Sequence, residues 1–247
     1  MITVDFKRIS MKPGCRVLDV GCGTGRHTGA VYRFKDVTVI CADISYDDVL
    51  EARKRLVYQD KLGEGLGSYE ILLADIVALP FPDKFFDLVI CSEVLEHIRD
   101  QNTAASEIVR VLKPGGNLVV SVPRFFPERI CWALSDDYGS TDKGHIRIYR
   151  KKELINLLEN AGVKTRAVRF AHSLHTPYWW LKCIVGPSRD DSRPVNLYHR
   201  FLTWDIMKRP RVTRVLETIL NPVLGKSIVL YLRKEKNPGP KNQVFQD

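Results

Sequence analysis

The chain has 247 residues, 45% of them hydrophobic and 27% charged, a composition that excludes a disordered or collagen-like protein. Its apolar runs fall short of the ~18 residues that a membrane-spanning helix needs, and its charged start, residues 1–14, is not expected to be a secretory signal. The formal net charge of +9 is uneven, because residues 1–123 hold 15 basic and 17 acidic side chains and residues 124–247 hold 23 and 12. All four tryptophans lie in the second part, so we expect the two parts to have different roles.

Short apolar runs alternate with helix-like stretches through the first part. A helix is expected after the first run, a second at 45–57 behind an S-x-x-D capping box, and a third from about 102 to 112. The apolar runs predict strands at 16–20, 37–42, 69–73, 85–91 and 118–122. Near-continuous Val, Ile and Leu strands separated by helices are typical of a parallel sheet covered on both faces. The sequence therefore predicts an α/β fold.

The second part is less regular. A loop is expected over 124–144 and an amphipathic helix over 151–161, ended by a glycine. Two strands are expected at 163–171 and 227–232, and the insertion between them, 172–226, contains two predicted helices near 197–207 and 212–220. The Pro-, Gly- and Lys-rich tail is expected to be disordered.

The strongest local signal is the stretch VLDVGCGTG at 17–25, where a strand leads into a glycine-rich turn and then a helix. Gly21, Gly23 and Gly25 let the backbone turn sharply and approach a ligand, and the following helix N-terminus suits an anionic group. Asp43 ends the next strand, where a carboxylate can accept hydrogen bonds from ribose hydroxyls. The third glycine comes one residue too early for the pyrophosphate-binding pattern G-x-G-x-x-G, which disfavours NAD(P). A turn used only for packing is the structural alternative.

Five segments in order resemble the class I S-adenosylmethionine-dependent methyltransferases, in particular the small-molecule group that includes the ubiquinone and menaquinone biosynthesis enzymes. The segments are LDVGCGTG (18–25), ADIS (42–45), ADI (74–76), FDLVICSEVLEH (86–97) and LKPGG (112–116). The resemblance is close over 16–123, weaker through 145–147 and the helix at 151–161, and absent over 172–226.

The resemblance implies a Rossmann-like, doubly wound, seven-stranded and mostly parallel sheet with helices on both faces. The last strand would be antiparallel, and a helical insertion would precede it. We accordingly divide the chain into a methyltransferase core at 1–171, with a cofactor half at 1–123 and an acceptor half at 124–171, followed by further segments. These are the aromatic and basic insertion at 172–226 as a substrate lid, the last core strand at 227–234 and the tail at 235–247.

The resemblance also implies S-adenosyl-L-methionine as the cofactor and S-adenosyl-L-homocysteine as the product. Asp19 would anchor the methionine end of the cofactor through the turn made by Gly21, Gly23 and Gly25. The donor is already activated, so the protein would mainly hold acceptor and methyl in line and exclude water.

Four further positions and Asp43 would complete the cofactor site. Asp43 would hold the ribose hydroxyls, with Ile44 beside the adenine. Asp75 would bond the adenine amino group, with Ile76 on the ring face, and Cys91 would give backbone contacts near the methionine moiety. Aspartate also caps strand-to-helix turns, so each acid has a structural alternative.

His145 and His97 are the candidate catalytic residues, as a general base or a substrate contact. His97 follows the fourth predicted strand with Glu93 and Glu96, and these three side chains either face the acceptor or cap and pack the following helix.

No metal site is expected, because no set of His, Cys and carboxylate residues has convincing ligand spacing. His172 and His175, in particular, look too loosely spaced to form one. The six cysteines are scattered without a C-x-x-C pair, which favours a reducing cytoplasm.

The segment after the fourth strand also limits which classes of acceptor we expect. It lacks the Asn/Asp-Pro-Pro-aromatic motif by which amino-methylating DNA and RNA enzymes resemble one another, and the double-acid loop of arginine methyltransferases. The methylated atom is therefore expected to be an oxygen, carbon, sulfur or other nitrogen of a small-molecule acceptor.

The insertion combines aromatic residues with Lys and Arg, and we expect it to be a solvated lid whose aromatic residues pack on the core. A peripheral membrane contact at the inner face, which would deliver a lipid-like or isoprenoid acceptor, is the first alternative, and a dimer contact stays open with the oligomeric state. Basic patches with aromatics also suit RNA, although nucleic acid is the less favoured partner. A non-catalytic adenosylmethionine-binding protein is the last alternative.

Overall fold

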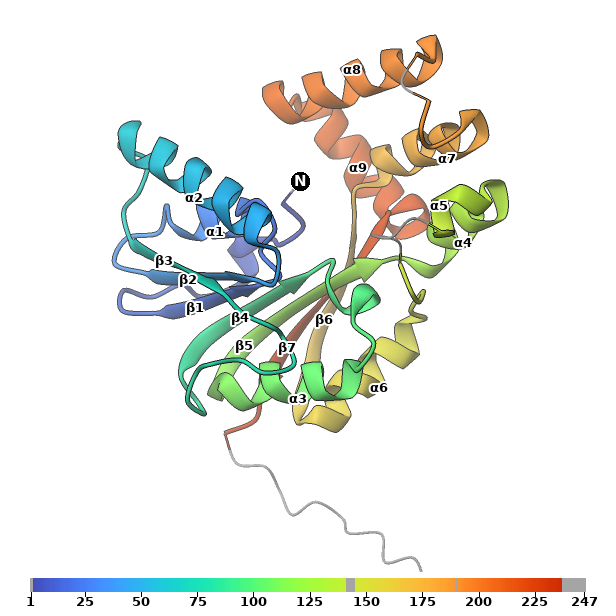
Figure 1. Cartoon of the computed structure of the whole chain (residues 1–247). Helices are drawn as coiled ribbons and strands as arrows, with labels where there is room; N and C mark the ends of the chain where they lie inside the picture. Colours follow the sequence, from blue (N-terminus) through green and yellow to red (C-terminus); the bar gives the residue numbers. More distant parts are fainter. Residues whose placement is uncertain (1, 141–144, 190, 237–247) are drawn as a thin grey trace, which may run out of the picture.

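A computed structural model describes residues 2–140, 145–189 and 191–236, and Figure 1 shows one twisted sheet with helices along both faces. The first part contains β1 (Arg16–Val20), α1 (Arg26–Val31), β2 (Thr38–Asp43), α2 (Tyr46–Lys61), β3 (Ser68–Leu73), β4 (Phe86–Ser92), α3 (Gln101–Val111) and β5 (Leu112–Pro123). The second part contains α4 (Phe125–Leu134), α5 (Asp136–Ser140), α6 (Lys151–Ala161), β6 (Val163–Ala171), α7 (Thr176–Val185), α8 (Arg193–Lys208), α9 (Arg211–Leu224) and β7 (Ser227–Lys234).

The seven strands form one sheet in the order β3-β2-β1-β4-β5-β7-β6. β7 runs antiparallel to both β5 and β6, and the other neighbouring pairs are parallel. The predicted fold class is therefore confirmed, including the antiparallel last strand and the helical insertion before it. The strand order reverses between β1 and β4, and ligands of such sheets bind in the crevice beyond the carboxyl ends of the strands at this point.

Alternate residues of each central strand supply the two halves of the core. Leu18 packs on the face covered by α3 and α6, where Ile108 and Leu158 are fully buried. Val17, one residue earlier, packs on the opposite face with Val31 of α1. This alternation follows from the two-residue period of a strand, and burial on both faces explains why the strands are almost continuously apolar.

The loop predicted over 124–144 is wrong for the residues that the structure describes, because α4 and α5 occupy most of it. Pro127 suggested a chain break, yet it is the third residue of α4. Proline is tolerated in the first turn of a helix, where the missing N–H would have no intrahelical partner. Residues 141–144 lie outside the described residues.

The insertion holds the two predicted helices, as α8 and α9, and adds α7 before them. α7 also begins with a proline, Pro177, in its first turn. Thr176 Oγ1 donates to Leu224 O over 2.6 Å, and Trp180 Nε1 donates to Pro127 O over 3.1 Å. These bonds tie the insertion to itself and to α4.

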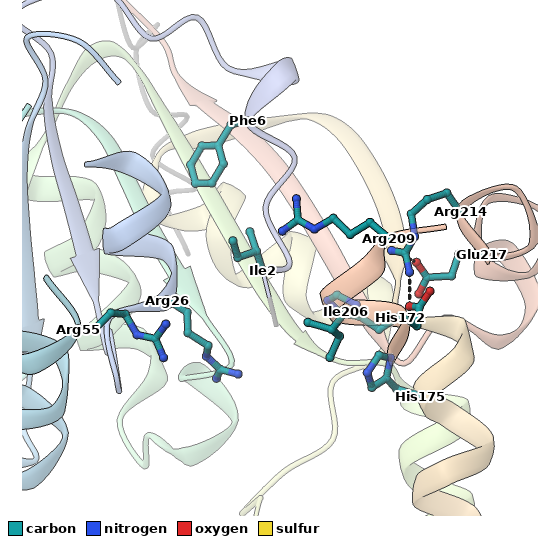
Figure 2. Close-up of a pocket in the computed structure, with 11 residues that line it drawn as sticks. Ile2, Phe6, Arg26, Arg55, His172, His175, Ile206, Arg209, Arg214 and Glu217 are labelled. Atoms are coloured by element: carbon teal, nitrogen blue, oxygen red, sulfur yellow. Dashed lines mark hydrogen bonds and ion pairs between the residues drawn. The ribbon is translucent and has the colours of Figure 1, made fainter. Parts of the chain in front are cut away.

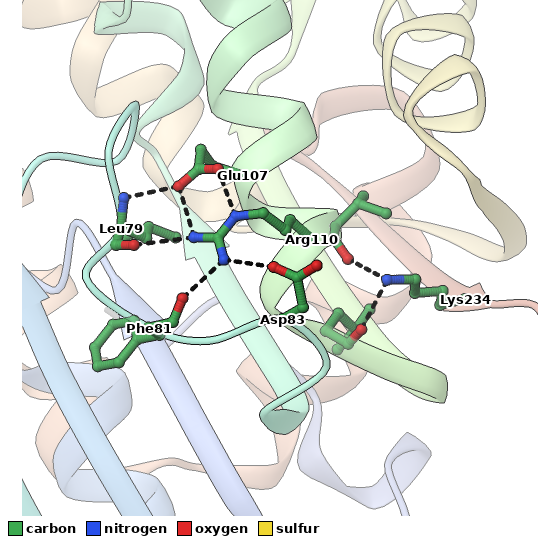
Figure 3. A network of polar contacts seen from close by, with 8 residues as sticks. Leu79, Phe81, Asp83, Glu107, Arg110 and Lys234 are labelled. Carbon is green, nitrogen blue, oxygen red and sulfur yellow. Dashed lines mark hydrogen bonds and ion pairs between the residues drawn. The ribbon is translucent and has the colours of Figure 1, made fainter.

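A network around Arg110 of α3 holds the segment that follows β3 (Figure 3). The Arg110 guanidinium donates to the carbonyl oxygens of Phe81 and Leu79 over 2.7 and 2.9 Å, and also pairs with Glu107 and Asp83. Glu107 in turn accepts from the Leu79 N–H over 2.9 Å. The network therefore fixes the course of the chain beyond the predicted adenine contacts at 75 and 76.

No helix within the described ranges is both long and apolar enough to cross a membrane. Apart from its first two residues, the predicted tail at 235–247 lies outside the described residues.

Candidate functional site

The glycine turn, residues 21–25, lies at the carboxyl end of β1 and requires its glycines. Gly21 and Gly25 have φ of 66° and 72°, in the left-handed region that strains other residues. A Cβ added to Gly21 would stand 2.3 Å from Val94 Cγ2, and one added to Gly25 would stand 3.0 Å from the Ala52 Cβ. The Gly21 N–H donates to Ala42 O over 2.8 Å, which holds the turn against the end of β2.

Two carboxylates fix this turn from opposite sides. The Asp43 carboxylate accepts from the Gly23 N–H over 2.7 Å and from the Ser45 N–H over 2.9 Å. Asp19 is 1% exposed and accepts from the backbone N–H and the hydroxyl of Thr28 at the start of α1. Asp19 therefore lies behind the turn and shapes it, whereas Asp43 is partly exposed at its edge.

The other predicted cofactor residues surround the same edge of the sheet at different depths. Ile44 is 69% exposed directly after Asp43, whereas Ile76 is 5% exposed and belongs to the core. Asp75 accepts from the Val77 N–H over 3.1 Å, the local turn bond that the structural alternative describes. Cys91 is fully buried near the end of β4, in register with Val20 of β1.

The two catalytic candidates lie beside each other, although they are far apart in the sequence. The ring centroids of His97 and His145 are 5.1 Å apart. His145 Nδ1 pairs with the carboxylate of Glu128, which is 1% exposed and comes from α4. A carboxylate on Nδ1 holds an imidazole in one orientation and leaves Nε2 to exchange a proton.

Glu128 was missed at the sequence level because its segment was predicted to be a loop. The available signal was a carboxylate directly after Pro127, two residues before the apolar run that begins at Ile130. Tyr138 of α5 also donates to Glu128, over 3.4 Å, so both new helices contribute to this corner of the site.

Two more carboxyl groups lie at the end of β4. Burial raises the pKa of Glu93, and burial together with the charge of Glu93 raises the pKa of Glu96 well above its usual value. Glu93 has a φ of 58°, which is strained for a residue with a side chain, and accepts from Ser121 Oγ over 3.2 Å. Donor atoms of Glu96, His97 and His145 lie within 4.8 Å of one another, so this group could hold a cation.

A cavity of about 550 Å³ separates the cofactor half from the insertion (Figure 2). Arg26, the residue after the glycine turn, and Arg55 of α2 line one wall, and His172, His175 and Arg209 line the other. The cationic side chains of both parts thus meet at this cavity. Its position beside Gly25 makes it a candidate acceptor space.

Comparisons with known proteins agree with this geometry. Residues 18–120 match the family described as a methyltransferase domain. The ubiquinone/menaquinone biosynthesis C-methyltransferase UbiE of Vibrio vulnificus is 39% identical over 123 residues, which are 47% of this chain and 45% of that protein. A sterol 24-C-methyltransferase of Gibberella zeae is 35% identical over 147 residues, 59% of this chain and 35% of that protein. The chain thus spans less than half the length of these relatives.

Among solved structures, the cyclase SpnF superposes with a TM-score of 0.61 at 20% identity, covering 94% of this chain and 78% of that one. This likeness extends the shared fold beyond the sequence match and into the second part. It concerns the fold alone, and a cyclase on this fold shows that the reaction must be argued from the site.

The pH dependence of the free energy of unfolding tests whether Asp19 is a buried carboxyl group behind the turn. Burial raises its pKa from 3.8 to about 6, against the hydrogen bonds from Thr28. A carboxyl with a raised folded-state pKa ionises more easily in the unfolded chain, so its contribution to stability falls as pH rises through this window. We expect Asp19→Asn to gain in free energy of unfolding relative to wild type between about pH 4 and about pH 6, by at most ~3 kcal/mol in total.

Chemical denaturation at several pH values measures this difference. Asp47→Asn, which removes an exposed carboxyl on α2, is the control and should show no such trend. A difference between Asp19→Asn and wild type that stays constant from pH 4 to pH 8 would contradict the assignment.

Proposed function

We propose that this chain, whose residues 18–120 match a methyltransferase domain, transfers a methyl group from S-adenosyl-L-methionine to a small-molecule acceptor by in-line displacement. The observation that carries the proposal is the glycine turn at the carboxyl end of β1, with the Asp43 carboxylate at the end of β2 bonded to it. Val94, which follows β4, lies against Gly21, and the segment after it carries His97, whose ring lies beside that of His145 in the His145–Glu128 pair.

The residues at the turn fit the cofactor. A Cβ added to Gly23 would meet no atom within 4 Å among the described residues, so a ligand can approach the backbone there. The Asp43 carboxylate keeps acceptor capacity for ribose hydroxyls beside its two backbone bonds, because each oxygen has two lone pairs. Ile44, Asp75, Ile76 and Cys91 are the proposed adenine and methionine contacts, with Ile76 acting from the core beneath the ring.

When bound, S-adenosyl-L-methionine would supply a methyl group that its sulfonium already activates, and S-adenosyl-L-homocysteine would be the product. The protein orients the acceptor and excludes water. Where the acceptor atom carries a proton, His145 Nε2 takes it, with Glu128 holding the ring and stabilising the resulting imidazolium.

The acceptor is proposed to be lipid-like or isoprenoid. Among the relatives, one is named a sterol and one a quinone-biosynthesis methyltransferase, which supports a large apolar acceptor for this chain. An RNA methyltransferase and a non-catalytic adenosylmethionine-binding protein are the alternatives that the test below distinguishes.

A specific observation on α9 supports a peripheral membrane contact as the source of such an acceptor. The helix faces inward with polar side chains, burying Thr213 and Glu217. Its apolar stripe is instead exposed to solvent, and consists of Val212, Val215, Leu216, Ile219 and Val223. These positions recur at helical spacing, so they lie on one face.

Cations flank this stripe. Lys208 and Arg209 at the end of α8 and Arg211 at the start of α9 are exposed, and Lys and Arg near an anionic surface each contribute ~1 kcal/mol of attraction. An exposed apolar face bordered by cations is typical of helices that lie in a membrane interface. An RNA surface would need polar and stacking groups there rather than aliphatic ones.

Methyl-label transfer from S-adenosylmethionine into separated small-molecule, lipid, RNA and protein pools tests the function. We expect label in the small-molecule or lipid pool, and a fall in kcat of roughly 10²–10⁴ in His145→Gln, because the proton acceptor is lost. His199→Gln, on the exposed side of α8, is the control. Label in RNA or protein only, or no turnover of a protein that binds the cofactor, would refute the proposal. An unchanged kcat in His145→Gln would refute its role alone.

Flotation with vesicles containing phosphatidylglycerol tests the membrane contact. We expect binding at low salt that is reduced in Val215→Glu and Ile219→Glu, since each places a charge on the apolar stripe. Val57→Glu, at a partly exposed valine of α2, should bind as wild type does. Absence of binding at low salt would contradict the contact, as would a stripe that instead forms a dimer in sedimentation experiments.

A further inference from the structure

Three side chains with metal-binding donors meet on the insertion side of the cavity (Figure 2). His172 directly follows β6, His175 comes three residues later, and Glu217 belongs to α9. One donor atom from each lies within 4.8 Å of the other two. His172 adopts a left-handed conformation with a φ of 65°, which is strained for histidine and turns the chain so that both rings share this corner.

Polar atoms in this corner are buried without partners. Among the described residues, His172 Nε2, His175 Nδ1 and Asp205 Oδ1 accept or donate no hydrogen bond. His175 is 6% exposed and Asp205 is 1% exposed. Leaving such a group unsatisfied in the interior is costly, so three together indicate that something polar occupies the space between them.

Two carboxylates lie beside the imidazoles. Arg214 donates to Glu217 over 2.8 Å and also pairs with Asp205, so both carboxylates face one guanidinium. Arg214 also holds Glu217 in one orientation, as outer partners of metal ligands commonly do.

We propose that His172, His175 and Glu217 bind a divalent transition-metal ion of the zinc class. Two imidazoles and a carboxylate form a common zinc ligand set, with metal–ligand distances of about 2.0–2.2 Å. The donor atoms would have to move by about 1 Å to reach these distances from one ion. The fourth position opens toward the cavity and suits an oxygen ligand. Asp205 lies beside the three ligands, where its unpartnered oxygen compensates the charge of the ion.

This site could not be recognised in the sequence, because its third ligand is far from the other two along the chain. His172 and His175 form only an H-x-x-H pair, and Glu217 follows 42 residues later on a different helix. The expectation of no metal rested on local spacing and does not extend to donors that the fold brings together.

Metal content and binding measurements on the full chain test the proposal. After removal of metals with a chelator and dialysis against zinc, we expect one zinc per chain by elemental analysis, and a single site by calorimetry with zinc chloride. Cobalt in place of zinc should give visible d–d bands without a thiolate-to-cobalt charge-transfer band. A charge-transfer band would assign the metal to cysteines and overturn the proposal.

Substitutions of the proposed ligands test where the ion binds. Both His175→Asn and Glu217→Gln keep the side-chain size and should weaken the zinc Kd by at least ~tenfold, with their folding checked by circular dichroism. His199→Ala, at an exposed histidine of α8, should bind zinc as wild type does. A folded wild-type protein that binds no zinc would show that water fills the corner. Loss of binding in His145→Gln, with none in His175→Asn, would assign the ion to the Glu96 group and equally overturn the proposal.

Discussion

The hydrogen bond from the Gly23 N–H to the Asp43 carboxylate joins the glycine turn to the end of β2. Behind it, Asp19 binds the first turn of α1 through Thr28, so the turn is held from both sides. Only glycine tolerates the backbone conformations and close approaches at 21 and 25. Because these contacts set where β1 ends and α1 begins, they also set the position of Arg26 on the cavity wall and the shape of the crevice toward β4.

The uneven charge of the chain corresponds to different positions of acids and cations in the structure. At the site, Asp43, Asp19 and Glu93 of the first part accept hydrogen bonds within the fold, at the turn and at the end of β4. The insertion, residues 172–226, has 9 basic and 4 acidic side chains and so holds about half of the excess positive charge of the second part; there Arg209 lines the cavity and Arg211 borders the apolar stripe. The near-neutral part thus contributes the glycine turn and its hydrogen-bonded acids, and the basic part contributes the insertion wall of the cavity.

The sheet and the glycine turn could be predicted from the sequence because their signals are local. Strand periodicity and glycine spacing depend on neighbouring residues, and they located β1 to β4 to within a few positions. α4 lies in a segment that was predicted to be a loop, and α7 was not predicted; each has a proline in its first turn, Pro127 or Pro177, a position that is compatible with a helix. Partners from separate elements, such as Glu128 for His145, carry almost no local signal and become visible only when the fold assembles them.

Calorimetric titration with S-adenosyl-L-homocysteine tests the central claim, that the glycine turn and Asp43 form a cofactor site. The account predicts binding to the wild-type chain, loss of measurable binding in Asp43→Ala, and an intermediate affinity in Asp43→Asn, which keeps one acceptor oxygen at the turn. Asp47→Asn should bind as wild type does, because its carboxyl is exposed on α2 and apart from the turn. Undiminished binding in Asp43→Ala would contradict the account.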